Sequence, residues 1–195
     1  MTDHDSLAER GRALEEEYFR RRDRELIEKM RQVADAEGAR AELGRQTGVQ
    51  DAALLKELQE LGFTPDTVIL LPVMPVLEMG WAEGEITASE RSLIVKFARS
   101  RGIDEHSAAD QQLTEWIARR PDGAVFAGAR RLIAAVLSSG APQAGGPLTG
   151  ADLVAYCEQV AAASGGLLGL RMGSVSQEEK ALLTRIASDF KTRQT

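Results

Sequence analysis

Cysteine, histidine and aromatic residues are all scarce in this chain of 195 residues. The single cysteine, Cys157, excludes an internal disulfide, and its apolar helical surroundings favour a small buried side chain without chemistry. Aromatic residues make up only 5% of the chain, whereas alanine, leucine, glutamate and arginine dominate. Because these abundant residues are strong helix formers, the sequence predicts an all-α protein with essentially no sheet.

Long apolar runs are also missing. The longest one, residues 68–77, is interrupted by two prolines and is too short to span a bilayer. The first five residues are polar and acidic and lack the apolar segment of a secretion signal. We therefore expect no membrane span and a cytoplasmic location.

Positive charge is in deficit, and catalytic motifs are absent. The 24 lysines and arginines face 30 acidic residues, which gives a net charge of −6 and argues against a nucleic-acid partner. The only histidines, His4 and His106, lie in no metal-ligand spacing. The chain also lacks a dinucleotide-binding glycine loop, a Walker loop and a nucleophile elbow. The sequence favours a non-enzymatic protein without a cofactor.

A repeated pattern of eleven residues is the most informative feature that is present. It occurs at Gly84–Ile94 and again at Gly173–Leu183, an offset of 89 residues. Each copy has a glycine, then Thr or Ser, then Glu three residues later, just ahead of apolar residues. This order is a capping box, in which the hydroxyl and the carboxylate satisfy the first free N–H groups of a helix. Each copy therefore predicts a turn that leads into a helix.

The segments around the two copies extend the repeat into two helical hairpins. Before the first copy, residues 64–81 predict a short turn, a kink near Pro72 and then a buried helix. Before the second copy, Thr149 and Asp152 predict another helix cap, at an offset of 85 from Thr64. The two offsets, 89 and 85 residues, differ by four residues, and this difference in length falls in the turn 165–173. We predict a helical bundle over 48–195, with repeat one at about 64–102 and repeat two at about 149–191.

Residues 1–47 predict a long charged helix that ends near Thr47 and Gly48. Charged side chains crowd residues 9–31 and leave a thin apolar stripe along the helix. A stripe this narrow cannot anchor a helix deep in a core, so the helix projects, pairs with a partner or lies along the bundle. We expect a protein partner to bind through residues 9–33. The stripe consists of Leu14, Tyr18, Phe19, Leu26, Ile27, Met30 and Val33.

Residues 77–90 and 174–182, which contain the two capping boxes, resemble the TerB-like family, named for bacterial tellurite-resistance proteins. The resemblance covers roughly residues 51–191. It implies an all-helical bundle with two pseudo-repeats and a non-enzymatic module. It also implies roles in stress response and in membrane-linked complexes, and metal-ion binding through acidic turn residues.

Acidic residues near the first glycine turn are the candidate ligands for such an ion. They are Glu78, Glu83 and Glu85, which could contribute to a site for calcium or another divalent ion. Calcium takes six or more oxygen ligands, and the second copy has no acid aligned with Glu83. The alternative is that these acids serve only the turn and the cap, with no ion bound.

Residues 13–27 resemble the inhibitory segment of the mitochondrial ATP synthase inhibitor protein, which implies regulation of an F1-type ATPase. The adjacent aromatics Tyr18 and Phe19 point about 100° apart on a helix, so one narrow interface cannot cover both. They suggest a docking surface for a protein. The alternative is a solvated helix with i,i+4 pairs such as Glu16–Arg20 and Glu17–Arg21. The matching positions are Glu15, Glu16, Tyr18, Phe19, Arg20, Arg22, Arg24 and Glu25.

Three functions thus follow from the sequence. The first is a TerB-like interaction or stress-response module that binds a protein through the N-terminal helix. The alternatives are an inhibitor of a rotary ATPase and a divalent ion-binding module. The oligomeric state and membership of a membrane-associated complex stay open.

Overall fold

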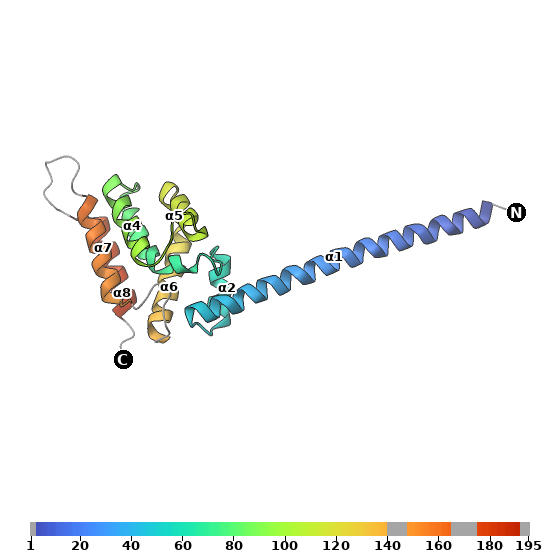
Figure 1. Ribbon diagram of the computed structural model, residues 1–195, viewed down its shortest axis with the longest axis horizontal. Helices are drawn as coiled ribbons and strands as arrows, with labels where there is room; N and C mark the ends of the chain where they lie inside the picture. The colour runs from blue at the N-terminus through green and yellow to red at the C-terminus, as the bar shows by residue number, and fades with distance from the viewer. Residues whose placement is uncertain (1–2, 140–147, 165–174, 192–195) are drawn as a thin grey trace. The chain divides into compact units, whose positions relative to one another are not determined.

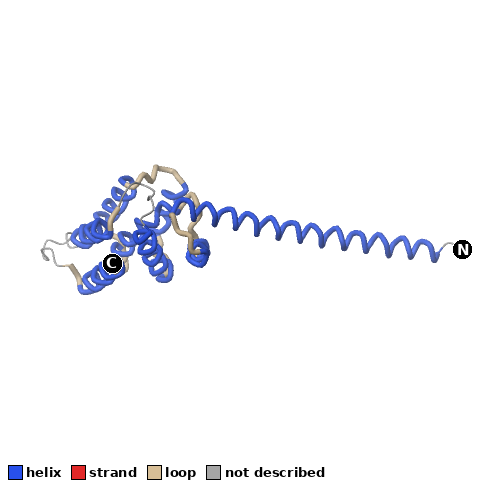
Figure 2. The backbone as a smooth tube through the Cα atoms, turned by 90° about the horizontal axis from the view of Figure 1, so that it is seen from below, coloured by secondary structure: helices blue, strands red, loops and turns tan. Residues whose placement is uncertain are grey.

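Helices make up the fold in the computed structural model, which describes residues 3–139, 148–164 and 175–191. Within these ranges there are eight α-helices, one 3-10 helix (η1) and no strand, which confirms the all-α prediction (Figures 1 and 2). None of the described helices is both long enough and apolar enough to cross a membrane. In chain order the helices are α1 (Asp3–Thr47), α2 (Ala52–Glu60), η1 (Val68–Val73), α3 (Met74–Gly80), α4 (Ala88–Ser100), α5 (Ala108–Ala118), α6 (Gly123–Ser139), α7 (Gly150–Ser164) and α8 (Gln177–Lys191).

The chain forms two compact units, residues 1–41 and 42–195, which meet inside α1. The first unit is helical from Asp3 onward, and its side chains are described from Glu15. In the second unit, the last turns of α1 bury Leu43 and Thr47. Thr47 Oγ1 donates to the Leu43 carbonyl at 2.7 Å and accepts from the Val49 N–H at 3.3 Å. These bonds lie at the end of α1, whose last residue is Thr47.

The segment before the first capping box is broken and buried, as the prolines predict. The Val68 N–H donates to the Thr64 carbonyl at 2.9 Å and closes a turn. The tighter helix η1 follows and contains Pro72, which has no N–H to donate. The chain then enters α3, whose residues are buried except for Glu78, which is partly exposed. The sequence predicted this order of turn, kink and helix.

The helices α3 and α4 form one hairpin, and α7 and α8 form the other. Helix α7 packs against α3, α4 and α8, which brings the two hairpins together in one core (Figure 1). Gly80 allows α3 to approach α4 closely, because a Cβ there would lie 2.9 Å from Ile94 Cδ1. The origin of the hairpins by duplication stays a prediction. The turn 165–173, where the sequence places their difference in length, lies outside the described residues.

A buried arginine connects three helices of the bundle. Arg130 of α6 is 8% exposed and forms ion pairs with Glu78 of α3 and with Asp189 of α8. Its Nε lies 2.9 Å from the Asp189 carboxylate. Burial alone would lower the pKa of Arg130, but the hydrogen bonds and charges of the two carboxylates raise that pKa above its ordinary value. The guanidinium therefore stays charged within the bundle.

Replacing Arg130 with methionine should destabilise the bundle strongly. The change removes the cation that both carboxylates share, and Glu78 is then left largely buried without its partner. We expect a loss of about 2–4 kcal/mol in the free energy of unfolding, measured by urea denaturation. The matched control is Arg131→Met, because Arg131 is the next residue of α6 and also pairs with a glutamate, Glu57 of α2, but the Arg131 side chain is 59% exposed. This control should cost less than about 1 kcal/mol. Equal losses in both variants would contradict a special role for Arg130.

Candidate functional site

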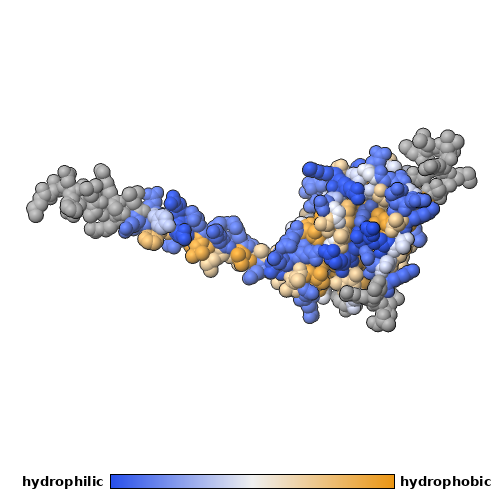
Figure 3. Space-filling view, turned by 180° about the vertical axis from the view of Figure 1, so that it is seen from behind, coloured by the Kyte–Doolittle hydropathy of each residue, from blue (hydrophilic) through white to orange (hydrophobic). Residues whose placement is uncertain are grey.

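The most exposed apolar surface of the described chain lies on α1. Large apolar side chains that are exposed occur, among the described residues, only between Tyr18 and Val33. At 100° per residue, four of them fall within roughly 60° of one another on the helix, and Tyr18 and Ile27 flank them. They appear in Figure 3 as apolar groups along one edge of a hydrophilic helix. We call these six residues the α1 stripe: Tyr18, Phe19, Leu26, Ile27, Met30 and Val33, which are 48% to 64% exposed.

The two aromatic residues of the α1 stripe partly cover each other. The rings of Tyr18 and Phe19 meet edge to face, with centroids 5.8 Å apart. The guanidinium of Arg21 lies over the Tyr18 ring, 5.9 Å from its centroid. Even so, Phe19 stays 60% exposed. The rings are therefore held in place on the helix surface and remain accessible.

The charged residues predicted to bind a partner surround this stripe. All eight predicted positions between Glu15 and Glu25 are exposed, as is every residue from 15 to 38. The predicted pair of Glu16 with Arg20 is present at 2.7 Å. An exposed pair of this kind contributes little to stability, on the order of 0.3–0.5 kcal/mol. These charges are thus free to adjust to a binding partner.

The three candidate metal ligands differ in their surroundings. Glu78 lies in α3 and is paired with Arg130, whereas Glu83 and Glu85 are exposed in the turn before α4. The described residues hold no group of three or more histidine, cysteine or acidic side chains arranged for a metal ion. Divalent ion binding by Glu78, Glu83 and Glu85 stays a prediction.

Both repeated motifs form the predicted capping boxes. In α4, the Thr87 N–H donates to the Glu90 carboxylate at 2.7 Å, and the Glu90 N–H donates to Thr87 Oγ1 at 3.3 Å. In α8, the N–H of Ser176 donates to the Glu179 carboxylate at 2.7 Å, and the return bond to Ser176 Oγ measures 3.2 Å. These capping bonds account for the positions of both carboxylates, so no bound ligand is needed to explain them.

The sequence did not reveal that both capping glutamates would be buried. Glu90 is 2% exposed and Glu179 is 1% exposed. Burial raises the pKa of Glu90 above its ordinary value of 4.5, although hydrogen bonds from Thr87 act in the opposite direction. The charges of Glu179 and Glu83 raise this pKa further. The Glu179 carboxylate therefore lies close enough to Glu90 to raise the pKa of Glu90.

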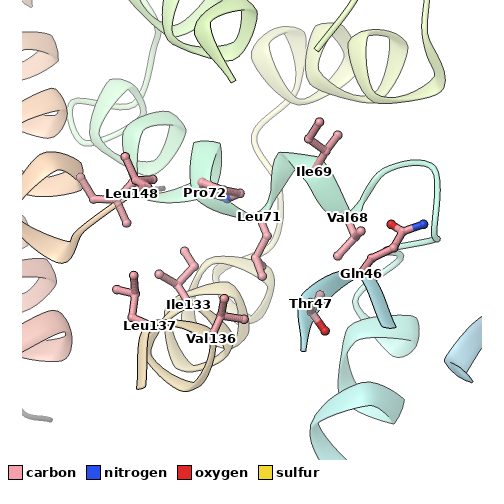
Figure 4. A pocket seen from close by; sticks show the side chains of 11 residues that line it. Gln46, Thr47, Val68, Ile69, Leu71, Pro72, Ile133, Val136, Leu137 and Leu148 are labelled. Carbon is pink, nitrogen blue, oxygen red and sulfur yellow. The ribbon is translucent and has the colours of Figure 1, made fainter. Parts of the chain in front are cut away.

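A small apolar cavity lies between η1, α6 and the end of α1. Leu71 of η1 points toward Ile133 and Val136 of α6, and Gln46 and Thr47 lie at one side (Figure 4). Its volume is about 40 Å³, and its lining is mainly aliphatic. Bound water needs several polar partners, and a metabolite needs far more room. We interpret this cavity as a gap in packing.

Comparisons of the chain with protein-family models, with curated proteins and with solved structures found no match. The resemblances to the TerB-like family and to the ATP synthase inhibitor protein therefore stay predictions from the sequence.

The raised pKa of Glu90 predicts a particular dependence of stability on pH. The folded chain binds this proton more tightly than the unfolded chain does. The resulting stabilisation is therefore present below about pH 4.5 and is lost as the pH rises through the folded pKa. Glu90→Gln keeps a side chain that can complete the capping box, but it cannot titrate.

The measurement is the free energy of unfolding of the wild type minus that of Glu90→Gln, from about pH 4 to about pH 7. This difference should decline as the pH rises. Glu178→Gln removes an exposed carboxylate from the first turn of α8 and should show no such decline. A difference for Glu90→Gln that stays constant or increases would show that burial does not raise the pKa of Glu90.

Proposed function

We propose that this chain is a non-enzymatic interaction module that binds a protein partner through residues 9–33 of α1. The observation that carries the proposal is the α1 stripe. Within the described residues, the bundle buries its large apolar side chains fully or partly, whereas α1 exposes six of them between Tyr18 and Val33. Exposed apolar groups concentrated on one helix are typical of a binding surface.

The dimensions of the stripe suit a helix that binds in a groove. The sixteen residues from Tyr18 to Val33 extend over about 22 Å of helix at 1.5 Å per residue. Anchors at Phe19, Leu26, Met30 and Val33 repeat at intervals of seven, four and three residues, which suits one face of a helix. An aromatic side chain near one end and aliphatic side chains along the rest supply the buried anchors that dominate binding energy.

Charges of both signs beside the stripe favour a partner that also carries both signs. Arg22 and Lys29 lie along one edge of the stripe, and Glu16 and Asp23 lie along the other. Such an arrangement controls orientation and association rate more than affinity. A partner groove with an acidic edge and a basic edge would complement it.

The cellular setting is proposed on sequence grounds. The resemblance over residues 51–191 supports a role in stress response, such as tellurite resistance. The net charge of −6 and the single buried cysteine support a cytoplasmic protein.

Mutation of the stripe should weaken partner binding. The partner is first isolated from native cytosol with the full-length chain, and its Kd is then measured by calorimetry. Phe19→Ser combined with Leu26→Ser should raise the Kd at least about tenfold, because two apolar anchors are lost. The control is Glu28→Gln combined with Asp35→Asn, which alters exposed residues on the opposite side of α1. An unchanged Kd for the serine variant would place the binding surface elsewhere.

Inhibition of a rotary ATPase is a second candidate. It is supported by the resemblance of residues 13–27, by the helical conformation of this segment and by the exposure of Tyr18 and Phe19. The full chain should then inhibit ATP hydrolysis by a purified F1-type ATPase, and deletion of residues 15–25 should abolish inhibition. Eleven residues make about three full turns, so their removal rotates the helix before the deletion by only about 20° relative to the helix after it. Inhibition that survives the deletion, or that is absent in the full chain, eliminates this candidate.

A further inference from the structure

A second cavity in the bundle combines an apolar floor with polar groups at its rim. It has a volume of about 170 Å³ and lies between α3, α4 and α7. Its floor includes Val76, Phe97 and Val160, which are at most 2% exposed. The ring of Tyr156 lies against that of Phe97, with centroids 4.2 Å apart. The floor is therefore preformed and apolar.

Three polar side chains at this cavity have no hydrogen-bond or ion-pair partner among the described residues. They are Lys96 of α4 and Tyr156 and Gln159 of α7. The fourth polar group, Ser100 Oγ, already donates to the Phe97 carbonyl at 2.7 Å. An ammonium, a phenol and an amide, all able to donate hydrogen bonds, thus line one apolar hollow.

The described lining of this cavity carries one positive charge, that of Lys96. Acidic residues outnumber basic ones by 30 to 24 in the sequence, yet none of the eight lining residues that the structure describes is acidic. A larger hollow of about 510 Å³ beside α6 differs in this respect. Of its three arginines, Arg130 and Arg131 are already paired with carboxylates, and the acidic residue Asp189 is itself part of the lining. The smaller cavity is therefore the better place for an anion, because Lys96 brings no carboxylate with it.

We propose that this cavity binds a small organic anion, a monocarboxylate with an apolar body. The apolar body lies on Val76, Phe97 and Val160, and the carboxylate pairs with the Lys96 ammonium. The Tyr156 hydroxyl and the Gln159 amide donate the remaining hydrogen bonds. Pockets for drug-sized ligands measure about 300–1,000 Å³, so a volume of 170 Å³ restricts the ligand to a small molecule. The site does not depend on the α1 stripe.

The test uses the full-length chain labelled with nitrogen-15 and three probes of similar shape: benzoate, benzyl alcohol and benzylammonium. Two-dimensional NMR records the amide shifts during titration at millimolar concentrations. Benzoate should produce saturable shifts at Lys96, Phe97, Tyr156 and Gln159. Benzyl alcohol should bind at least about tenfold more weakly, and benzylammonium should not saturate the site.

Two variants test whether the carboxylate of benzoate pairs with Lys96. Lys96→Met should weaken benzoate binding at least about tenfold, because it keeps a long apolar side chain and removes the charge. Lys56→Met changes an exposed lysine of α2, a helix that does not line this cavity, and should leave the Kd unchanged. Since Lys96 is exposed, the variant should keep the spectrum of a folded chain.

Three results would overturn the proposal. They are the lack of a saturable benzoate shift at these residues, binding of benzyl alcohol or benzylammonium as tight as that of benzoate, and binding of benzoate by Lys96→Met with the wild-type Kd. Equal binding of the alcohol would show that the cavity accepts apolar groups without selecting a charge.

Discussion

The ion pairs of Arg130 constrain how three helices of the bundle pack together. An arginine keeps its charge at ordinary pH, so carboxylates nearby offset much of the cost of burying Arg130. Glu78 comes from α3 in the first hairpin, and Asp189 comes from α8 in the second. The guanidinium on α6 thereby holds both hairpins against one helix. The pairing also uses Glu78, which is one of the three acids that the sequence offers as metal ligands.

Local hydrogen bonds made much of this fold predictable. The caps at Thr87, Thr149 and Ser176 each join groups only three residues apart, so a short pattern is sufficient to recognise them. The ion pairs of Arg130 join residues 52 and 59 positions apart. They depend on how the helices pack, and no local pattern encodes them. The burial of Glu90 and Glu179 was missed for the same reason, since a cap can form equally well on an exposed helix.

The two candidate surfaces differ in how far the sequence reveals them. The α1 stripe follows from helical periodicity, because its residues lie on one continuous helix with few apolar neighbours. The cavity at Lys96 collects residues from three helices, and its lining shares no spacing or motif. Its polar groups also look ordinary in sequence, because lysine and glutamine on a helix surface are normally solvated. Only the packing of α7 against α3 and α4 brings them to an apolar floor.

Charge acts differently at these two surfaces. On α1 both signs are exposed to solvent, and salt screens such charges beyond roughly 8–10 Å. Electrostatics there can orient a partner, but the apolar stripe must supply most of the affinity. At the cavity, Lys96 adjoins buried apolar groups in a protein of net charge −6, so an anion gains little from the field of the whole molecule. Recognition there must rely on direct contact with the ammonium. Anion binding therefore depends on the Lys96 ammonium and on the lack of a carboxylate among the described lining residues.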